Sequence, residues 1–155
     1  MSGFWDWALQ AYRGPGVSEA CLTLQDTHGQ NVPLLLWAAW TAATGRTLDE
    51  ETIEAACDAA RAWDGAAVGP LRAIRRTLKG PIPDIGDEGR EALREKVKAV
   101  ELAAERALMV DLETLVPESG GSLIASLDAM VAVARVWTRV VPRPALAALA
   151  ERLPA

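Results

Sequence analysis

The sequence predicts an all-α protein, a single-domain bundle of about six or seven helices, and three observations lead to this prediction. Apolar residues recur at helical spacing along most of the 155 residues, and Gly and Pro separate the segments. No apolar run has the length and alternation expected of a β-strand. One segment, at about 31–45, is apolar around its whole circumference, which predicts a helix buried at the centre of the others.

This central helix carries a start signal and a stop signal. Asn31 is a preferred N-terminal cap, Pro33 lies in the first turn, and Gly45 stands just past the end. Leu35 and Trp37 lie between these signals, among apolar neighbours that leave no face for water. We therefore expect both side chains to be enclosed.

Two helices are expected before residue 31. The first spans about 2–13, and its apolar positions recur at i, i+3, i+4 and i+7: Trp5, Ala8, Leu9 and Tyr12. Phe4 and Trp7 flank this stripe, so the aromatic first turn either completes the core or meets a partner. The second spans 17–28 and ends at Gly29. Its expected inward residues are Ala20, Cys21, Leu24 and Thr27.

A fourth helix is expected from Thr47 to about Trp63. Thr47 and Glu50 have the spacing of a capping box. The expected inward residues are Ile53, Ala56, Cys57, Ala60 and Trp63. Gly65 and Gly69 then allow a bend before a short helix over 70–79.

The remaining helices follow a proline-rich connection. Residues 80–86 include Pro81 and Pro83 and are expected to form an internal hinge of the single domain. A long helix is expected over 87–115, with Leu93, Val97, Val100, Ala104, Leu108 and Leu115 turned inward. Pro117 and Gly120-Gly121 end it. A second apolar helix is expected at about 122–141, and a last one at 145–153.

Charge and composition exclude several classes of protein. The net charge near -5 and the pI near 4.9 disfavour binding of nucleic acid over a broad surface, because phosphate neutralisation needs clustered positive charge. The longest charge-free run is too short and too polar for a comfortable membrane span, and the first residues do not resemble a secretion signal. Two cysteines in apolar helices do not form a disulfide framework. We expect a protein of the reducing cytoplasm.

The most localised charged feature is a cationic helix face. Four basic residues fall at i, i+3, i+4 and i+7 of the 70–79 helix: Arg72, Arg75, Arg76 and Lys79. Such a face either holds an anionic ligand or an acidic partner segment, or pairs with acids of neighbouring helices. The second alternative is the more frequent one for a charged helix face in a soluble protein.

Other residues with functional chemistry are few. Cys21, His28 and Cys57 are the only soft or imidazole ligands, and Cys21 and His28 lie about 10 Å apart along one helix, too far to share a metal ion. We expect no metal, no cofactor and no catalytic residue. Gln25 and Asp26 lie beside His28 in the sequence, and Asp111 and Asp128 lie on or near apolar stripes. If the fold brings these residues together, they form a buried acid set with Arg72 or Arg135. Such sets more often join helices than catalyse.

Two blocks of the sequence resemble a known family. The first contains Trp5-x-Trp7-Ala8-Leu9, Pro15-Gly16-Val17 and the run from Ala20-Cys21-Leu22 through Leu34-Leu35-Leu36 to Trp40, and the second contains Pro70-Leu71-Arg72-x-x-Arg75 and Leu78-Lys79. From Phe4 to about Lys79 the chain resembles the proteobacterial domain of unknown function 2390 family, whereas the carboxyl-terminal half is similar only in being helical. The resemblance implies a small cytoplasmic bacterial protein and supplies no activity.

Two functions from different classes are therefore open. The first is a non-catalytic protein-interaction or regulatory module, which binds its partner through the aromatic first turn and the cationic helix. The second is a small-molecule-binding protein or enzyme with an anionic-ligand site lined by Gln25, Asp26, His28, Arg72 and Arg75. A homodimer through the long helix is a third arrangement.

Overall fold

The computed structural model describes residues 3–117 and 121–154, and every regular element within these residues is helical. The elements are α1 (Phe4–Tyr12), α2 (Val17–His28), α3 (Val32–Ala43), α4 (Glu50–Trp63), the π-helical segment η1 (Asp64–Val68), α5 (Gly69–Thr77), α6 (Asp87–Thr114), α7 (Ser126–Trp137) and α8 (Arg143–Ala150). Because α4, η1 and α5 follow one another without a break, they count as one of 7 continuous helices. The predicted all-α bundle is confirmed.

The α3 helix is the centre of the bundle, as its apolar sequence predicts. It contacts α1, α2, α4, α6 and α7, and Leu35 and Trp37 are 1% and 0% exposed. The Asn31 side chain caps it by accepting a hydrogen bond from the Leu34 N–H at 3.0 Å. The Trp37 indole N–H donates to the Leu112 carbonyl at 2.9 Å, which joins the core helix to α6.

The first helix packs through a different face from the predicted one. Phe4 and Ala11 are buried together with Ala8, whereas Leu9 and Tyr12 are each 41% exposed. The α1 helix is turned so that the Phe4 ring stacks on Trp40, with 5.2 Å between the ring centroids. The predicted start at Ser2 lies outside the described residues.

The second helix has the predicted bounds, but its buried face is narrower than expected. Cys21 and Leu24 are buried as predicted, and Gly29 ends the helix with a φ of 62°, which glycine adopts without strain. Ala20 is half-buried and Thr27 is exposed. The predicted inward position of Thr27 is therefore wrong.

The cap of α4 is Asp49 and not Thr47. The Asp49 carboxylate accepts a hydrogen bond from the Thr52 N–H at 2.7 Å. Hydrogen bonding to the Thr52 side chain, together with this backbone contact, holds the pKa of Asp49 below its ordinary value. The helix consequently begins at Glu50. Its buried residues agree with the prediction: Ile53, Ala56, Cys57 and Ala60, with Trp63 half-buried.

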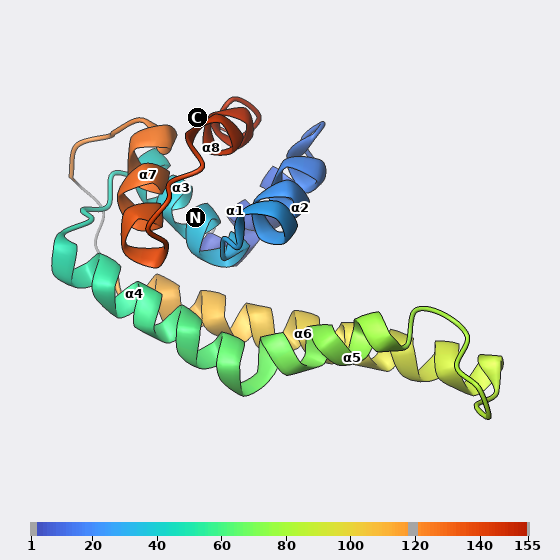
Figure 1. The fold of residues 1–155 in the computed structure, drawn as a ribbon. Coiled ribbons are helices and arrows are strands. Elements are labelled where there is room, and N and C mark those ends of the chain that lie inside the picture. The colour runs from blue at the N-terminus through green and yellow to red at the C-terminus, as the bar shows by residue number, and fades with distance from the viewer. Residues whose placement is uncertain (1–2, 118–120, 155) are drawn as a thin grey trace.

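The predicted bend after α4 is present, but the helix continues through it. Directly after η1 the Gly69 N–H donates to the Asp64 carbonyl, five residues earlier, which is the π-helical spacing. A Cβ atom on Gly69 would lie 2.7 Å from that carbonyl oxygen, so only glycine fits this position without a shift of the backbone. In Figure 1, α4 and α5 form one bent rod that runs beside α6.

The amino-terminal half of α6 extends beyond the core, contrary to the predicted inward stripe. Ala104 and Leu108 are buried, but Leu93 and Val100 are 50% and 53% exposed. In Figure 1, α5, the following loop and the start of α6 project away from the other helices. The α5 helix, which has no buried residue, packs on this part of α6, so an apolar stripe there does not reach the core.

Polar contacts join the two helices of this projection. The α5 helix has no buried residue, and Arg90 of α6 is 6% exposed and donates to the Leu78 carbonyl at 2.7 Å, which caps the end of α5. The connection at 80–86 is non-helical, as its prolines predict. Its action as a hinge stays a prediction.

The second apolar helix is shorter than the predicted 122–141. Before Ser126 the chain is held in a non-helical path, because the Gly121 N–H donates to the Gly45 carbonyl at 2.6 Å. After Trp137 the backbone of Thr138 is extended, and its hydroxyl accepts a hydrogen bond from Gln30 Nε2 at 2.9 Å. The last helix begins at Arg143, two residues earlier than predicted. Gly120 lies outside the described residues.

Candidate functional site

The cationic face of α5 lies against acidic side chains of α6. Arg75 Nε donates to Glu101 Oε1 at 2.6 Å, and Arg72 approaches Glu101 at 3.6 Å and Glu105 at 3.8 Å. The Glu101 side chain is only 9% exposed. The hydrogen bond between Arg75 and Glu101 raises the pKa of Arg75. Burial raises the pKa of Glu105, and the negative charge of Glu101 adds to the rise.

Two further contacts join this cluster to α2. Arg72 Nη2 donates to Gln25 Oε1 at 3.2 Å, and Arg76 Nη2 donates to Asp26 Oδ1 at 3.0 Å. The fold thus brings together five of the seven predicted site residues at the junction of α2, α5 and α6: Gln25, Asp26, Arg72, Arg75 and Arg76. The arginine spacing on α5 is visible in the sequence, but the opposing α6 carboxylates are more than twenty residues away along the chain.

The other predicted site residues lie apart from this junction. His28 and Lys79 are both exposed, and neither side chain has an ion pair among the residues that the structure describes. Asp111, Asp128 and Arg135 are also exposed, so the buried acid set that includes them does not form. Asp111 instead accepts a hydrogen bond from the Trp63 indole at 2.8 Å.

The arrangement leaves little uncompensated positive charge for an anion. Arg72, Arg75 and Arg76 each face a carboxylate within 4 Å. An incoming phosphate or carboxylate would therefore compete with groups of the protein itself. The geometry is that of a charged network that joins helices.

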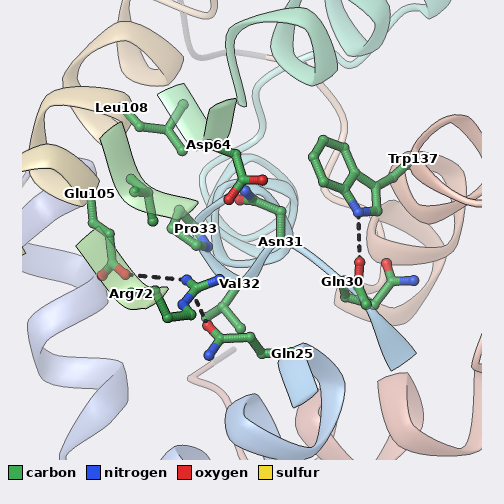
Figure 2. A pocket seen from close by; sticks show the side chains of 12 residues that line it. Gln25, Gln30, Asn31, Val32, Pro33, Asp64, Arg72, Glu105, Leu108 and Trp137 are labelled. Atoms are coloured by element: carbon green, nitrogen blue, oxygen red, sulfur yellow. Dashed lines mark hydrogen bonds and ion pairs between the residues drawn. The ribbon is translucent and has the colours of Figure 1, made fainter. Parts of the chain in front are cut away.

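A polar pocket lies beside this network, at the start of α3. It has a volume of about 130 Å³ and is lined by Gln25, Gly29, Gln30, Asn31, Val32, Pro33, Asp64, Val68, Arg72, Glu105, Leu108 and Trp137. Figure 2 shows Arg72 between Glu105 and Gln25 at one end and Trp137 beside Gln30 at the other. Neither Trp37 nor Trp40 lines it. Of the predicted site residues, Gln25 and Arg72 reach this pocket.

An apolar groove runs between α1 and α6 on the other side of Glu105. This α1–α6 groove has a volume of about 260 Å³ and is lined by Trp5, Ala8, Leu9, Tyr12, Pro33, Leu36, Leu102, Glu105 and Met109. A shallower hollow continues it toward Leu22 and Arg75. Sequence reasoning assigned Leu9 and Tyr12 to the core. An apolar stripe does not reveal whether another helix covers it, so the groove was missed.

Both thiols of the chain are buried and free. Burial raises the pKa of Cys21 to about 11 and the pKa of Cys57 to about 11, from ordinary values of 9.0. Burial also raises the pKa of the Tyr12 phenol, and the neighbouring Cys21 and Glu105 add to this rise. These thiols are poor nucleophiles, because the thiolate is the reactive form.

We expect iodoacetamide to alkylate Cys21 and Cys57 slowly in the folded protein. A pKa two units higher lowers the thiolate fraction at pH 8 about a hundredfold, and burial slows access further. Mass spectrometry with and without urea measures the labelling, and equal labelling in both states would contradict the prediction.

The two thiols should also make stability depend on pH. The folded state holds their protons more tightly than the unfolded state, so the free energy of unfolding should fall as the pH rises from about 9 to about 11. Urea melts across this pH range measure the change.

The described residues contain no group of three or more His, Cys, Asp or Glu side chains suited to a metal ion. No described helix has the length and apolar character needed to cross a membrane.

Comparison with protein families finds a match over most of the chain. A family model described as a protein of unknown function (DUF2390) matches residues 3–112 of the 155, which extends beyond the resemblance seen up to Lys79 and includes most of α6. Searches of the curated proteins and of the solved structures find no match to this chain.

Proposed function

We propose that this chain, which belongs to the DUF2390 family of proteins of unknown function, is a non-catalytic protein-interaction module. Its α1–α6 groove would bind an amphipathic helix of a partner protein. The observation that carries the proposal is the collection of exposed apolar side chains from α1 and α6 around one cavity, which Leu22 of α2 extends in the adjoining hollow.

The apolar character of the groove supports a protein partner. Of the residues that line the groove, Leu9 and Tyr12 are 41% exposed and Leu102 is 53% exposed, and Leu22 in the adjoining hollow is 55% exposed. Contiguous apolar surface of this kind marks interaction sites on soluble proteins. A cavity of about 260 Å³ accommodates one or two large apolar side chains, which is how grooves recognise the apolar face of a helix.

The negative charge of the groove and of the whole protein favours a partner with basic residues. Among the described residues, Glu105 is the one charged residue that lines the groove, and burial disfavours its ionised form. A lysine or arginine next to the apolar anchor of the partner would stabilise the Glu105 carboxylate. The net charge of -5 also favours a basic partner segment. We therefore propose that the groove binds an amphipathic helix that carries apolar residues at i and i+4 and an adjacent basic residue.

The chemistry of the groove favours binding over catalysis. Glu105 and the neighbouring Glu101 face guanidinium groups, and the two thiols of the chain are buried. Free thiols and the family resemblance support a bacterial, cytoplasmic setting.

The test selects binders from a displayed library of helical peptides and measures their affinity for two variants. Leu102→Asp places a charge in the groove, and Val110→Asp is the matched control, because Leu102 and Val110 lie on α6 with 53% and 52% exposure but only Leu102 lines the groove. We expect Leu102→Asp to weaken binding at least about tenfold and Val110→Asp less than about twofold. Glu105→Gln should weaken only peptides that carry the basic residue.

Three results would count against the proposal. One is a library that yields no peptide with helical apolar spacing. Another is selected peptides that bind wild type and Leu102→Asp equally. The third is sedimentation that shows a dimer of the wild type but not of Leu102→Asp, because a second copy of the chain would then be the occupant.

A further inference from the structure

We propose that this protein pairs with a second copy of itself through the outer side of α6, with the two α6 helices antiparallel. This inference goes beyond the proposed function, because it concerns a different surface from the α1–α6 groove and a different partner. The surface consists of six residues of α6, which we call the outer stripe: Leu93, Lys96, Val100, Ala103, Ala107 and Val110.

The outer stripe has the spacing of a coiled-coil seam. Its six positions alternate by three and four residues, which is a heptad repeat, and they extend for about 25 Å along the helix. Leu93, Val100 and Val110 are 50%, 53% and 52% exposed, and Ala103 is exposed as well. Large apolar side chains at such positions are normally covered by a second helix. In the single chain they face solvent.

The rest of the protein packs on other sides of α6. The α5 helix contacts the side that carries Arg90 and Glu101, and α1 contacts the side that carries Leu102 and Met109. In Figure 1 the amino-terminal half of α6 projects from the other helices together with α5. The outer stripe is therefore accessible to another helix along its length.

A second copy of α6 fits the outer stripe in one antiparallel register. When Val100 lies opposite Ala103 of the second copy, Leu93 lies opposite Val110, and Lys96 lies opposite Ala107. Each large apolar side chain then meets an apolar one. The small Ala107 leaves space for the stem of Lys96, whose ammonium group extends into water.

A parallel pair of α6 helices fits less well. It would place Lys96 directly against Lys96 of the second copy, so two like charges would meet within the seam. It would also bring the two helix bundles to the same end of the pair, because the carboxyl-terminal half of α6 packs in the bundle. The antiparallel pair places the bundles at opposite ends, where each projection lies beside the bundle of the other copy.

Charge complementarity supports the antiparallel register. Glu95 and Arg106 flank the same side of the outer stripe, and both side chains are exposed. In this register Glu95 of each copy lies within one helical turn of Arg106 of the other copy. The contact that Glu95 makes with Lys98 of its own helix is exposed at both ends and contributes little. The pair of opposite charges therefore favours this register over others.

The expected dimer is weak. The outer stripe covers fewer than three heptads, and two of its six positions are alanine. The interface consequently belongs to the small class of protein interfaces, and we expect a dissociation constant on the order of 10–100 µM.

Sedimentation equilibrium of the full chain at about 5–500 µM tests the association. We expect the wild type to approach a dimer at the highest concentration and Val100→Asp to weaken association at least about tenfold, because it places a charge in the seam of both copies. Leu102→Asp is the matched control, since Leu102 is 53% exposed like Val100 but lines the groove, and it should leave association unchanged. Far-UV circular dichroism should show that both variants keep the helical content of the wild type.

Disulfide cross-linking determines the register. Leu93→Cys and Val110→Cys variants, mixed and oxidised with diamide, should form a covalent dimer on non-reducing electrophoresis, because the two positions lie opposite each other. Each variant alone should form none, since its two new thiols would be about 25 Å apart along the helix pair. Cys21 and Cys57 are buried and should not contribute.

Four outcomes would overturn the proposal. These are a wild type that stays monomeric at every concentration, equal association of the wild type and Val100→Asp, no cross-link in the mixture, and equal cross-linking of each variant alone. The groove proposal fails or survives separately. Val110→Asp should weaken the dimer and leave peptide binding unchanged, whereas Leu102→Asp should have the opposite effects.

Discussion

Replacement of Trp37 by alanine is expected to lower the free energy of unfolding by about 4–5 kcal/mol. The side chain is completely buried in the helix that the other helices surround. Truncation leaves a cavity and also removes the indole donor from the Leu112 carbonyl, an acceptor in the buried end of α6. Because small domains are stable by about 5–15 kcal/mol, this change removes a large part of the total. Urea denaturation followed by far-UV circular dichroism measures it.

Trp63→Ala is the matched control for this substitution. The Trp63 indole also donates to a residue of α6, Asp111, at 2.8 Å, but Trp63 is only half-buried. We expect a loss of less than about 2 kcal/mol, because water can replace the contact and fill the space. If Trp37→Ala and Trp63→Ala cost the same, α3 is not the packed centre of the protein.

Replacement of Glu101 by alanine is expected to cost about 2 kcal/mol of unfolding free energy. Glu101 is 7% exposed and faces both Arg72 and Arg75, so its removal leaves two guanidinium groups close together, with Glu105 and Asp26 left to balance them. Breaking a fully buried ion pair costs about 3–5 kcal/mol, and the value here is smaller because the arginine side chains are 20% and 25% exposed. Urea denaturation again provides the measurement.

The loss should also be local. Because α5 has no buried residue and packs on α6 through these ion pairs, Glu101→Ala should speed amide hydrogen exchange in α5 and leave α3 protected. Glu95→Ala is the control on the same helix. Its partner Lys98 lies at 3.2 Å, but both side chains are exposed, so the expected change is below about 0.5 kcal/mol. Unchanged exchange in α5 would mean that apolar contacts hold the projection.

Sequence and structure agree best where one segment contains all the necessary information. The 31–45 helix is apolar on every face, and the structure buries it from Val32 to Ala42 apart from the half-buried Pro33. The buried face of α4 is equally well predicted, because acids crowd its outer side. The family resemblance is confirmed as well.

Sequence and structure differ where a second, distant segment decides whether a side chain is buried or paired. Leu9 and Leu93 both have core spacing, yet Leu9 borders a groove and Leu93 lies on a projecting helix. Thr47 is the cap that the capping-box spacing predicts, but in the structure Asp49 accepts the hydrogen bond from the Thr52 N–H. Similarly, the cationic spacing on α5 gave no indication that Glu101 and Glu105 would oppose it.

The sequence by itself determined the all-α class, the central helix and most helix ends, because helical period, caps and breakers act within a few residues. Only the tertiary structure decided which apolar stripes are covered, which charges are compensated and where the two cavities lie. The reason is physical: burial and charge pairing depend on surfaces that α1, α2, α5 and α6 supply from distant parts of the chain.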